Sequence, residues 1–416
     1  MADLSHAEES RAGWARFVAL WSRIGLLSFG GPAGQIALMQ DEVVTRRGWV
    51  SEDAFRRGLD VAMLLPGPEA QQLATWLGWR SHGLKGALIA GLAFILPGAV
   101  LITALAWLAT SGAENPVISA LFYGVQAAII VVVVRATVTL AKRAATGSMH
   151  WAVAVLAFAA LTFAGVPFPL VILVAGLVGL FALPRPEMPA GLPALAAGGV
   201  RRSVMTLLTG AVLLALGVGL AIALGGGALL EVAELFITAA LVSFGGAYAL
   251  LPFVAENAVE TYGWLTTEQM INGLALGEAT PGPLILVNLY AGFHAGLPGG
   301  TGSAVIAAAL TCWFTFVPSF TLILAAAPHV EALGRIAWAR AALAGVSAAV
   351  VGVIAYLAVY FGQAALLPDG FTGPEWPKIV LTLLFAALAF RRGLSVIALV
   401  LAGGGAGLAL WLAGLI

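Results

Sequence analysis

The chain has 416 residues, of which 61% are hydrophobic and only 10% are charged, and its formal net charge is zero. Soluble domains carry roughly a quarter charged residues, so this chain cannot cover its surface with polar groups and must expose apolar surface to lipid. The neutral balance argues against nucleic acid as a partner. A single cysteine, Cys312, excludes a disulfide framework and a thiolate metal site.

Long stretches without Asp, Glu, Lys or Arg divide the chain. Two examples run from Lys85 to Glu114 and from Glu278 to Glu331. Uncharged windows of about 18 or more mainly apolar residues are typical of membrane spans. The repeated windows predict an all-α integral membrane protein with about 12–13 transmembrane segments.

In chain order, the first half is expected to hold helices near 14–38, 57–79, 86–111, 117–140, 150–165 and 168–183. A Pro/Gly-rich stretch (184–199) and a lone apolar segment (204–224) follow. The second half is expected to hold helices near 231–254, 269–294, 302–327, 336–361, 376–390 and 393–415. We therefore divide the chain into a first transmembrane repeat (1–183), a linker with one connecting helix (184–230) and a second repeat (231–416).

The two halves share motifs at a constant offset of 215 residues. Ser28-Phe29-Gly30-Gly31 recurs as Ser243-Phe244-Gly245-Gly246, and Pro66-Gly67-Pro68 recurs as Pro281-Gly282-Pro283. The matched residues are not the Ala and Leu that dominate the composition, so the similarity indicates a duplication.

If each of the six predicted segments of the first half spans the membrane, the connecting helix adds a seventh crossing. The chain has then crossed an odd number of times before the second repeat begins. The second repeat is then inverted, an arrangement typical of secondary transporters. Loop Lys and Arg residues favour a cytoplasmic N-terminus in a multi-pass protein of the plasma (inner) membrane. The polar, acidic start has no basic segment ahead of an apolar core, so no cleaved signal peptide is predicted. The exceptions to this charge bias are Lys378 and a connector with Arg46, Arg47, Arg56 and Arg57, which fall outside. The connector is either an amphipathic interfacial helix or a join between two re-entrant segments, which would leave the parity of the crossings unchanged.

Each repeat interrupts its first two predicted helices at matched places. The breaks are Phe29-Gly30-Gly31-Pro32 and Pro66-Gly67-Pro68 in the first repeat, and Gly245-Gly246 and Pro281-Gly282-Pro283 in the second. Inside a membrane such breaks persist only where they are buried in protein or line a wet cavity. A break frees N–H groups at the start of the next half-helix, and these bind anions. We expect an anion site near the midplane; the alternative is that the breaks are kinks or close-packing points.

Ionisable residues at span depth are costly and usually functional. Glu69 directly follows the first Pro-Gly-Pro, and Glu278 precedes the second by three residues. Each could exchange a proton, because burial favours the neutral acid, or could cap backbone N–H groups. Arg23 and Arg135 could hold an oxyanion through the guanidinium fork, with snorkelling to the interface as the alternative.

Neutral side chains flank the Pro-Gly-Pro breaks and could hydrogen-bond an anion that must also be released: Gln71, Gln72, Asn272, Asn288 and Tyr290. Asp60 lies three residues from Arg57, which favours an intrahelical ion pair. The histidines have no metal-ligand spacing, and we expect no metal, no other cofactor and no catalytic residues. Without a phosphate-binding loop for ATP, transport would be driven by ion gradients.

At these motifs the sequence resembles the chromate ion transporter family in its two-domain form. The matching stretches are Ser28-Phe29-Gly30-Gly31-Pro32-Ala33, Gly48-Trp49 with Asp53 beyond it, Leu64-Leu65-Pro66-Gly67-Pro68-Glu69-Ala70-Gln71-Gln72-Leu73-Ala74, and, in degenerate form, Ser243-Phe244-Gly245-Gly246 and Ala279-Thr280-Pro281-Gly282-Pro283. The resemblance implies a plasma-membrane carrier of chromate, usually an efflux system that gives chromate resistance, with halves of opposite orientation. The second half has Ala247 and Leu284 in place of Pro32 and Glu69, which favours substrate contacts in the first half.

Three other functions compete with chromate transport. Sulfate is a tetrahedral dianion of similar size to chromate, so a carrier of sulfate or of another oxyanion would have the same sequence features. An anion channel would be expected to show a ring of identical pore charges, and none is visible. A membrane enzyme would need a catalytic constellation. The expected partners are a small inorganic oxyanion and membrane lipids, and a homodimer remains open.

Overall fold

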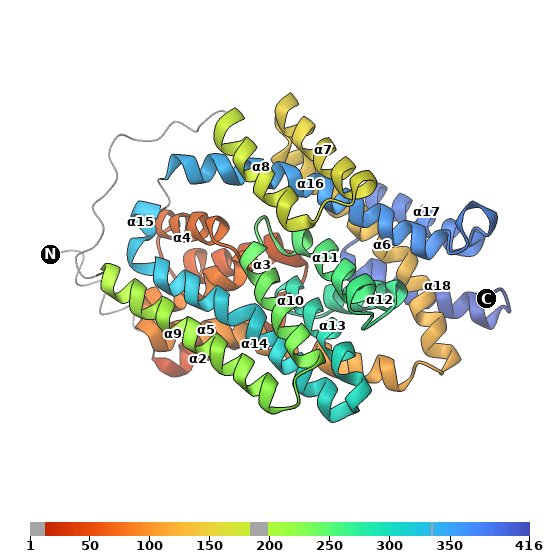
Figure 1. The fold of residues 1–416 in the computed structure, drawn as a ribbon, viewed down its shortest axis with the longest axis horizontal. Helices are drawn as coiled ribbons and strands as arrows, with labels where there is room; N and C mark the ends of the chain where they lie inside the picture. Colours follow the sequence, from red (N-terminus) through yellow and green to blue (C-terminus); the bar gives the residue numbers. More distant parts are fainter. Residues whose placement is uncertain (1–12, 184–198, 334–335) are drawn as a thin grey trace.

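The computed structural model describes residues 13–183, 199–333 and 336–416, and these residues form helices and short connections without a strand (Figure 1). Within this part of the chain, five helices are long and apolar enough to cross a membrane. They are α5 (Glu69–Ser111), α6 (Pro116–Ala144), α9 (Gly199–Ala223), α14 (Thr301–Ala326) and α16 (Ala337–Leu366). The predicted all-α membrane class is confirmed. Most of the Pro/Gly-rich stretch lies outside the described residues.

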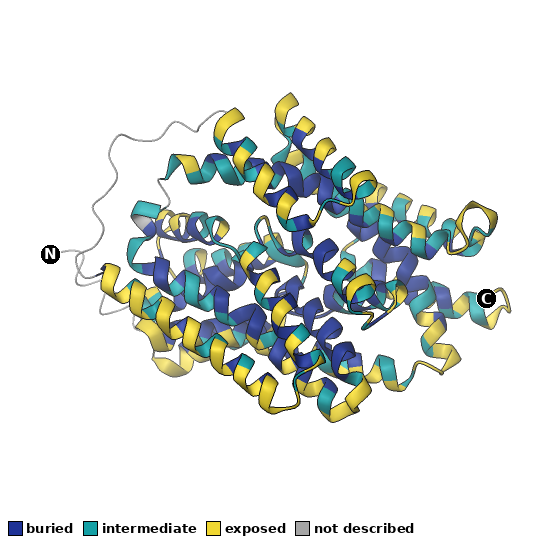
Figure 2. Ribbon diagram, viewed as in Figure 1, coloured by how far each residue is buried: buried dark blue, intermediate teal, exposed yellow. Residues whose placement is uncertain are grey.

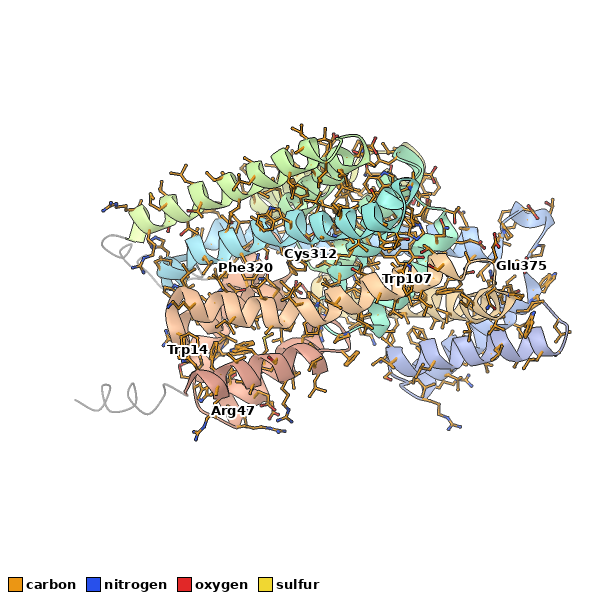
Figure 3. All side chains as sticks on the ribbon, turned by 90° about the horizontal axis from the view of Figure 1, so that it is seen from below. Trp14, Arg47, Trp107, Cys312, Phe320 and Glu375 are labelled. Atoms are coloured by element: carbon orange, nitrogen blue, oxygen red, sulfur yellow. The ribbon has the colours of Figure 1, made fainter. Side chains whose placement is uncertain are left out.

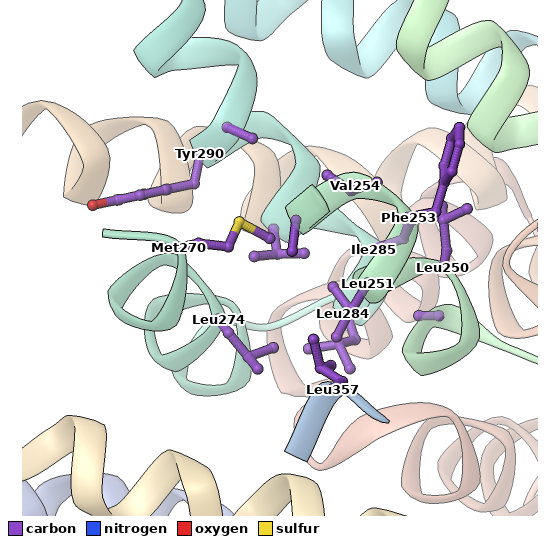
Figure 4. Packing of buried hydrophobic residues seen from close by; sticks show 14 of the residues in the cluster. Leu250, Leu251, Phe253, Val254, Met270, Leu274, Leu284, Ile285, Tyr290 and Leu357 are labelled. Carbon is purple, nitrogen blue, oxygen red and sulfur yellow. The ribbon is translucent and has the colours of Figure 1, made fainter. Parts of the chain in front are cut away.

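Apolar side chains cover the outside of the molecule as well as its centre. The connecting helix α9 is exposed along most of its length although it is apolar beyond Thr209 (Figure 2). Its face fits contact with lipid tails rather than with water. In the centre, buried residues such as Leu250, Leu274 and Leu284 pack around the breaks of the second repeat (Figure 4).

The long helix α5 turns back on itself at His82 and Gly83. Gly83 has φ 61° and ψ −151°, a backbone conformation that side chains with a Cβ rarely adopt. A Cβ on Gly78 would lie only 2.3 Å from the carbonyl oxygen of Gly86, so residues 69–81 and 84–111 pack as an antiparallel pair. The second repeat forms the same hairpin between α13 (Val287–Gly296) and α14.

The first segment of the first repeat begins and ends at the same end of the molecule. From α2 (Trp14–Leu27) the chain turns at the break and returns through α3 (Gly31–Gln40). The Phe17 ring lies 6.3 Å from the ring of Trp49, and Arg23 Nη1 lies 3.8 Å from Glu42 Oε1. Segment 14–38 is therefore a pair of helices that folds back on itself, called a re-entrant pair below, and not one continuous helix.

The second segment returns in the same way. Helix α4 (Glu52–Leu64) leads to Pro66–Pro68, and the first part of α5 runs back along it, with Gly58 packed on the Trp76 ring. The connector that carries the four arginines of the first repeat thus lies at the same end as Trp14 and not at the opposite end. Figure 3 shows Trp14 and Arg47 at one end and Glu375 at the other.

The second repeat uses the same plan with α10 (Ala228–Val242), α11 (Ala247–Glu256) and α12 (Thr267–Ala279). Trp264 Nε1 donates a hydrogen bond of 3.1 Å to Glu231 Oε2, which joins the end of the first re-entrant pair to its beginning. Gly273 of α12 packs on the Tyr290 ring of α13, as Gly58 packs on Trp76 in the first repeat.

The last two helices of each repeat pack on the long helix of the other repeat. Helices α7 (Ser148–Ala164) and α8 (Phe168–Ala182) lie against α16, while α17 (Trp376–Arg391) and α18 (Val396–Leu412) lie against α6 (Figure 1). Small residues allow close approach: Gly124 meets Gly403 and Gly407, and Gly179 meets Gly345. These contacts between helices of different repeats hold the two repeats together around the central breaks.

Candidate substrate site at the helix breaks

The four predicted breaks meet in two reciprocal backbone hydrogen bonds. Gly67 N–H donates to Ser243 O at 2.8 Å, and Gly282 N–H donates to Ser28 O at 2.9 Å. Each bond joins the Pro-Gly-Pro of one repeat to the Ser-Phe-Gly-Gly of the other, and the 215-residue offset converts one bond into the other. The breaks are therefore an interlocked centre and not four separate kinks.

The backbone of these breaks is non-helical, as the sequence predicts. Gly67 has φ 124° and Gly282 has φ 93°, values that only glycine adopts without strain. A Cβ on Gly67 would lie 2.6 Å from Gln72 Nε2 and 2.9 Å from Ser319 Oγ. Glycine is needed at this position both for its backbone angles and for the lack of a side chain.

A cavity of about 400 Å³ lies between the first break of each repeat. Gly30, Gly31 and Pro32 line one side of it, and Gly245 and Gly246 line the other. These residues precede or begin α3 and α11, each of ten residues, so the N-terminal ends of two helices border the cavity. Their backbone dipoles favour a negative ligand there.

Charged side chains of both signs face the same cavity. Glu69 and Glu278 contribute carboxylates, and Arg135 and Arg143 contribute guanidinium groups. Glu69 reaches across the repeat boundary, because a Cβ on Gly246 would lie 3.4 Å from its Oε1 atom. The cavity therefore presents two carboxylates and two guanidinium groups to one space.

Glu278 and Arg135 are fixed by hydrogen bonds within the cavity wall. The Tyr248 hydroxyl donates to Glu278 Oε1, and Glu278 is buried. Arg135 Nη1 donates to the backbone oxygen of Leu394 at 2.5 Å. This bond uses one donor of the guanidinium fork and leaves others for a ligand.

An adjoining cavity of about 420 Å³ shares Glu69, Arg143, Gly245 and Gly246 with the first. It extends to Asp60 and Arg340, whose Oδ2 and Nη2 atoms are 3.0 Å apart. The expected Asp60–Arg57 pair is wrong: the partner of Asp60 is an arginine of the other repeat. Glu69 thus lies where the two cavities meet.

Several predicted site residues support the breaks and do not line these cavities. Gln72 Nε2 donates to Pro66 O at 2.8 Å, and Gln71 accepts from Ser319 at 2.5 Å. Asn288 is buried, and neither polar atom of its amide has a hydrogen-bond partner among the described residues. Phe29, Pro68, Pro281, Gly282 and Pro283 also lie outside the cavity linings, whereas Gly67 lines the second cavity.

Arg23 lies apart from the cavities. Its side chain is 56% exposed and its nearest charged partner is Glu42, at 3.8 Å. Because α2 and α3 fold back together, Arg23 belongs to the cluster of Glu42, Arg46 and Arg47.

Three polar residues of the cavity wall that were absent from the predicted site are Arg135, Arg143 and Tyr248. Arg135 was considered at the sequence level because it follows four valines, but snorkelling explained it equally well. Tyr248 had no sequence signal, since the offset of 215 places Ala33 at its position in the first repeat. Arg135 and Tyr248 share one cavity with Glu69 and Glu278 because the two repeats pack together.

Comparison with known proteins places this chain in a family. The sequence model described as chromate transporter matches residues 15–180 and 230–408. The chain is 33% identical over 406 residues to the chromate transport protein of Pseudomonas aeruginosa. The matched region covers 96% of this chain and 91% of that protein. The chain belongs to the chromate transporter family.

Other members of the family are more distant but still match along most of their length. The chromate transport protein of Cupriavidus metallidurans is 27% identical, with 90% of this chain and 88% of that protein covered. The probable chromate transport protein of Synechococcus elongatus is 28% identical, with 83% of each chain covered. No solved structure matches the chain significantly. In this chromate transporter family member, the first repeat supplies Pro32 and Glu69 to the cavity, and the second supplies Tyr248 and Glu278.

Proposed function

We propose that this protein is a secondary transporter that carries chromate across the plasma membrane through the cavity at the interlocked breaks. The observation that carries the proposal is that glycine backbones of both repeats, two guanidinium groups and two carboxylates line one cavity at the meeting point of four half-helices. Discontinuous helices that point their N-termini at an anion are typical of secondary transporters. The names of the relatives supply chromate as the substrate.

The charges of the cavity suit a dianion that is bound and then released. Arg135 offers a planar fork of donors that fits a tetrahedral oxyanion. Glu69 stands beside the same space and repels a dianion while it is ionised, and in a poorly screened site this repulsion is worth several kcal/mol. Protonation of Glu69 removes the repulsion, so proton and anion movements become coupled.

We infer that the two repeats are inverted relative to each other. The two reciprocal hydrogen bonds are what a two-fold relation between the repeats produces. Each re-entrant pair returns to its starting side, so the re-entrant pairs leave the parity of the crossings unchanged. The chain then crosses in the long part of α5 (residues 84–111), in α6 and in α9, and it reaches the side opposite Trp14 before α10 begins.

We infer further that the N-terminal end faces the cytoplasm. Four of the five cations that the sequence placed outside belong to the re-entrant connector and lie with Trp14, which leaves Lys378 as the exception. Cytoplasmic loops are enriched in Lys and Arg, so this arrangement strengthens the orientation. On this proposal chromate enters the two adjoining cavities at Glu69 from the cytoplasmic side, as an efflux carrier requires.

The experiment is chromate uptake into inside-out membrane vesicles that contain the protein, with and without an imposed pH gradient. We expect uptake that depends on the gradient and that vesicles without the protein do not show. Sulfate in excess tests the competing substrate: sulfate that abolishes chromate uptake and is itself accumulated would show a general oxyanion carrier. Chromate flux that is absent in both vesicle orientations would contradict the proposal.

A further inference from the structure

A third cavity, of about 300 Å³, lies toward the end of the molecule opposite Trp14. It is formed by parts of α5, α6, α12, α13 and α17 and shares no lining residue with the two cavities at Glu69. Its polar lining includes Gln126, Asn272, Tyr290, His294 and Lys378. The sequence drew attention to Lys378 only as an exception in the loop charges, and the proposed substrate site does not use this cavity.

Lys378 is a buried cation without an ion-pair partner among the described residues. It is only 3% exposed, and its ammonium donates to Gln126 Oε1 at 2.9 Å and lies 4.3 Å from the centre of the Tyr123 ring. No described carboxylate lies within 4.0 Å of it. A buried charge held only by neutral groups is costly, so an anion beside it would stabilise the site.

A second buried group also faces this cavity with hydrogen-bonding capacity to spare. His294 is 3% exposed, lines the cavity and has no hydrogen-bond partner for its Nε2 atom among the described residues. Asn272 accepts from Gln126 Nε2 at 3.0 Å through its oxygen, which leaves its N–H donors free for a ligand. A cation and neutral donors around a small polar space are the groups that bind an oxyanion.

Two carboxylates oppose an anion in this cavity, but neither lies within 4.0 Å of the Lys378 ammonium. Glu268 lines the cavity and is exposed, and Glu375 accepts a hydrogen bond of 3.0 Å from the Tyr123 hydroxyl. Exposed charges are screened by solvent more than buried ones. Both carboxylates interact electrostatically with Lys378 without forming an ion pair with it, and they favour release of an anion outward.

The third cavity and the first are in line along two helices. On α6, nine residues separate Gln126 from Arg135, which is about 14 Å of helix. On α12, six residues separate Asn272 from Glu278, about 9 Å. The residues between them on both helices are mostly apolar and buried, such as 129–131 and 274–275. A buried apolar barrier thus separates two polar cavities.

We propose that the third cavity is a second binding site for a tetrahedral dianion, on the far side of this barrier, with Lys378 as its cation. The inference rests on the proposed transport function and adds an exit site to it. The substrate leaves the cavity at Glu69, passes the barrier when the repeats move, and is held at Lys378 before release.

Thiol protection tests this site in the purified protein in lipid nanodiscs, where both faces are open. The background is Cys312→Ser, which removes the only cysteine. Ser119→Cys places a thiol in the lining of the third cavity, and Thr139→Cys places the matched control in the first; both positions are exposed. The ligand is molybdate, a tetrahedral dianion that does not oxidise thiols as chromate does. The rate of modification by a charged thiol reagent is measured as molybdate is raised.

We expect molybdate to slow modification at both positions. Lys378→Gln should raise the molybdate concentration needed at Ser119→Cys by about tenfold or more, since a charged hydrogen-bond donor is lost. It should leave Thr139→Cys unchanged, which also shows that the variant is folded. Lys378→Arg should keep protection at both positions.

The outcomes separate the two proposals. Protection at Thr139→Cys alone, or protection at Ser119→Cys that Lys378→Gln does not change, would overturn the second site and leave the transport function standing. Absence of protection at both positions, together with absent chromate flux in vesicles, would overturn the transport function itself.

Discussion

Replacing Arg135 by glutamine removes a cation from the wall of the cavity while the helix that carries it stays intact. Arg135 lines the cavity together with both carboxylates and keeps part of its fork free after bonding to Leu394. A hydrogen bond to a charged group contributes about 1.5–3 kcal/mol, so Arg135→Gln should weaken oxyanion binding by about 10- to 100-fold. Arg135→Lys keeps the charge but not the planar fork and should fall in between.

The matched control is Arg23→Gln, because Arg23 is 56% exposed and lies apart from the cavity. Calorimetric titration of the purified proteins with molybdate gives the dissociation constants, and thermal unfolding checks that each variant is folded. We expect Arg23→Gln to stay within about twofold of the unchanged protein, as for surface substitutions in general. Equal losses for Arg23→Gln and Arg135→Gln, or no loss for Arg135→Gln, would refute the assignment of the cavity.

Two further predictions concern the contacts that hold the repeats together. Gly67→Ala should destabilise the protein by about 2–4 kcal/mol, because a Cβ at φ 124° is strained and the hydrogen bond to Ser243 is disturbed. The control is Gly219→Ala, where an added Cβ has no atom within 4 Å, and thermal unfolding of both variants measures the difference. Equal melting temperatures would contradict the prediction. The Asp60–Arg340 pair is 40% exposed on both sides, so a double-mutant cycle of Asp60→Asn with Arg340→Gln should give a coupling of at most about 1 kcal/mol. A coupling energy several times larger would contradict this prediction and show that the pair contributes strongly to holding the repeats together.

The helix breaks could be predicted from the sequence because their cause is local. A Pro-Gly-Pro triplet combines two missing backbone donors with a flexible glycine, and the triplets at 66–68 and 281–283 are non-helical as expected, whereas single prolines such as Pro97 and Pro318 stay inside helices. The apolar segments could be located for the same reason, since hydropathy is a property of each stretch of chain. What hydropathy does not encode is direction: a pair of half-helices that returns has the same composition as one helix that crosses.

The contacts of the site depend on packing between repeats and were less predictable. Asp60 pairs with Arg340, 280 residues away, and not with its sequence neighbour Arg57. Tyr248 reaches Glu278 because α11 and α12 lie at the same breaks. Glu69 could be selected beforehand because a carboxylate directly after a Pro-Gly-Pro break is unusual in an apolar segment. The four arginines of the first connector were the one local sign that it returns to the N-terminal side.

The most direct test of the account is the pH dependence of chromate flux in Glu69→Gln. Glu69 lies where the two cavities meet and faces Gly246 of the other repeat. Glutamine is nearly the same size and permanently neutral, so it imitates the protonated acid. The account predicts that inside-out vesicles with Glu69→Gln still take up chromate down its own gradient but gain nothing from an imposed pH gradient, whereas Glu69→Asp keeps part of the response. Chromate uptake by Glu69→Gln that responds to the pH gradient as the unchanged protein does would contradict it.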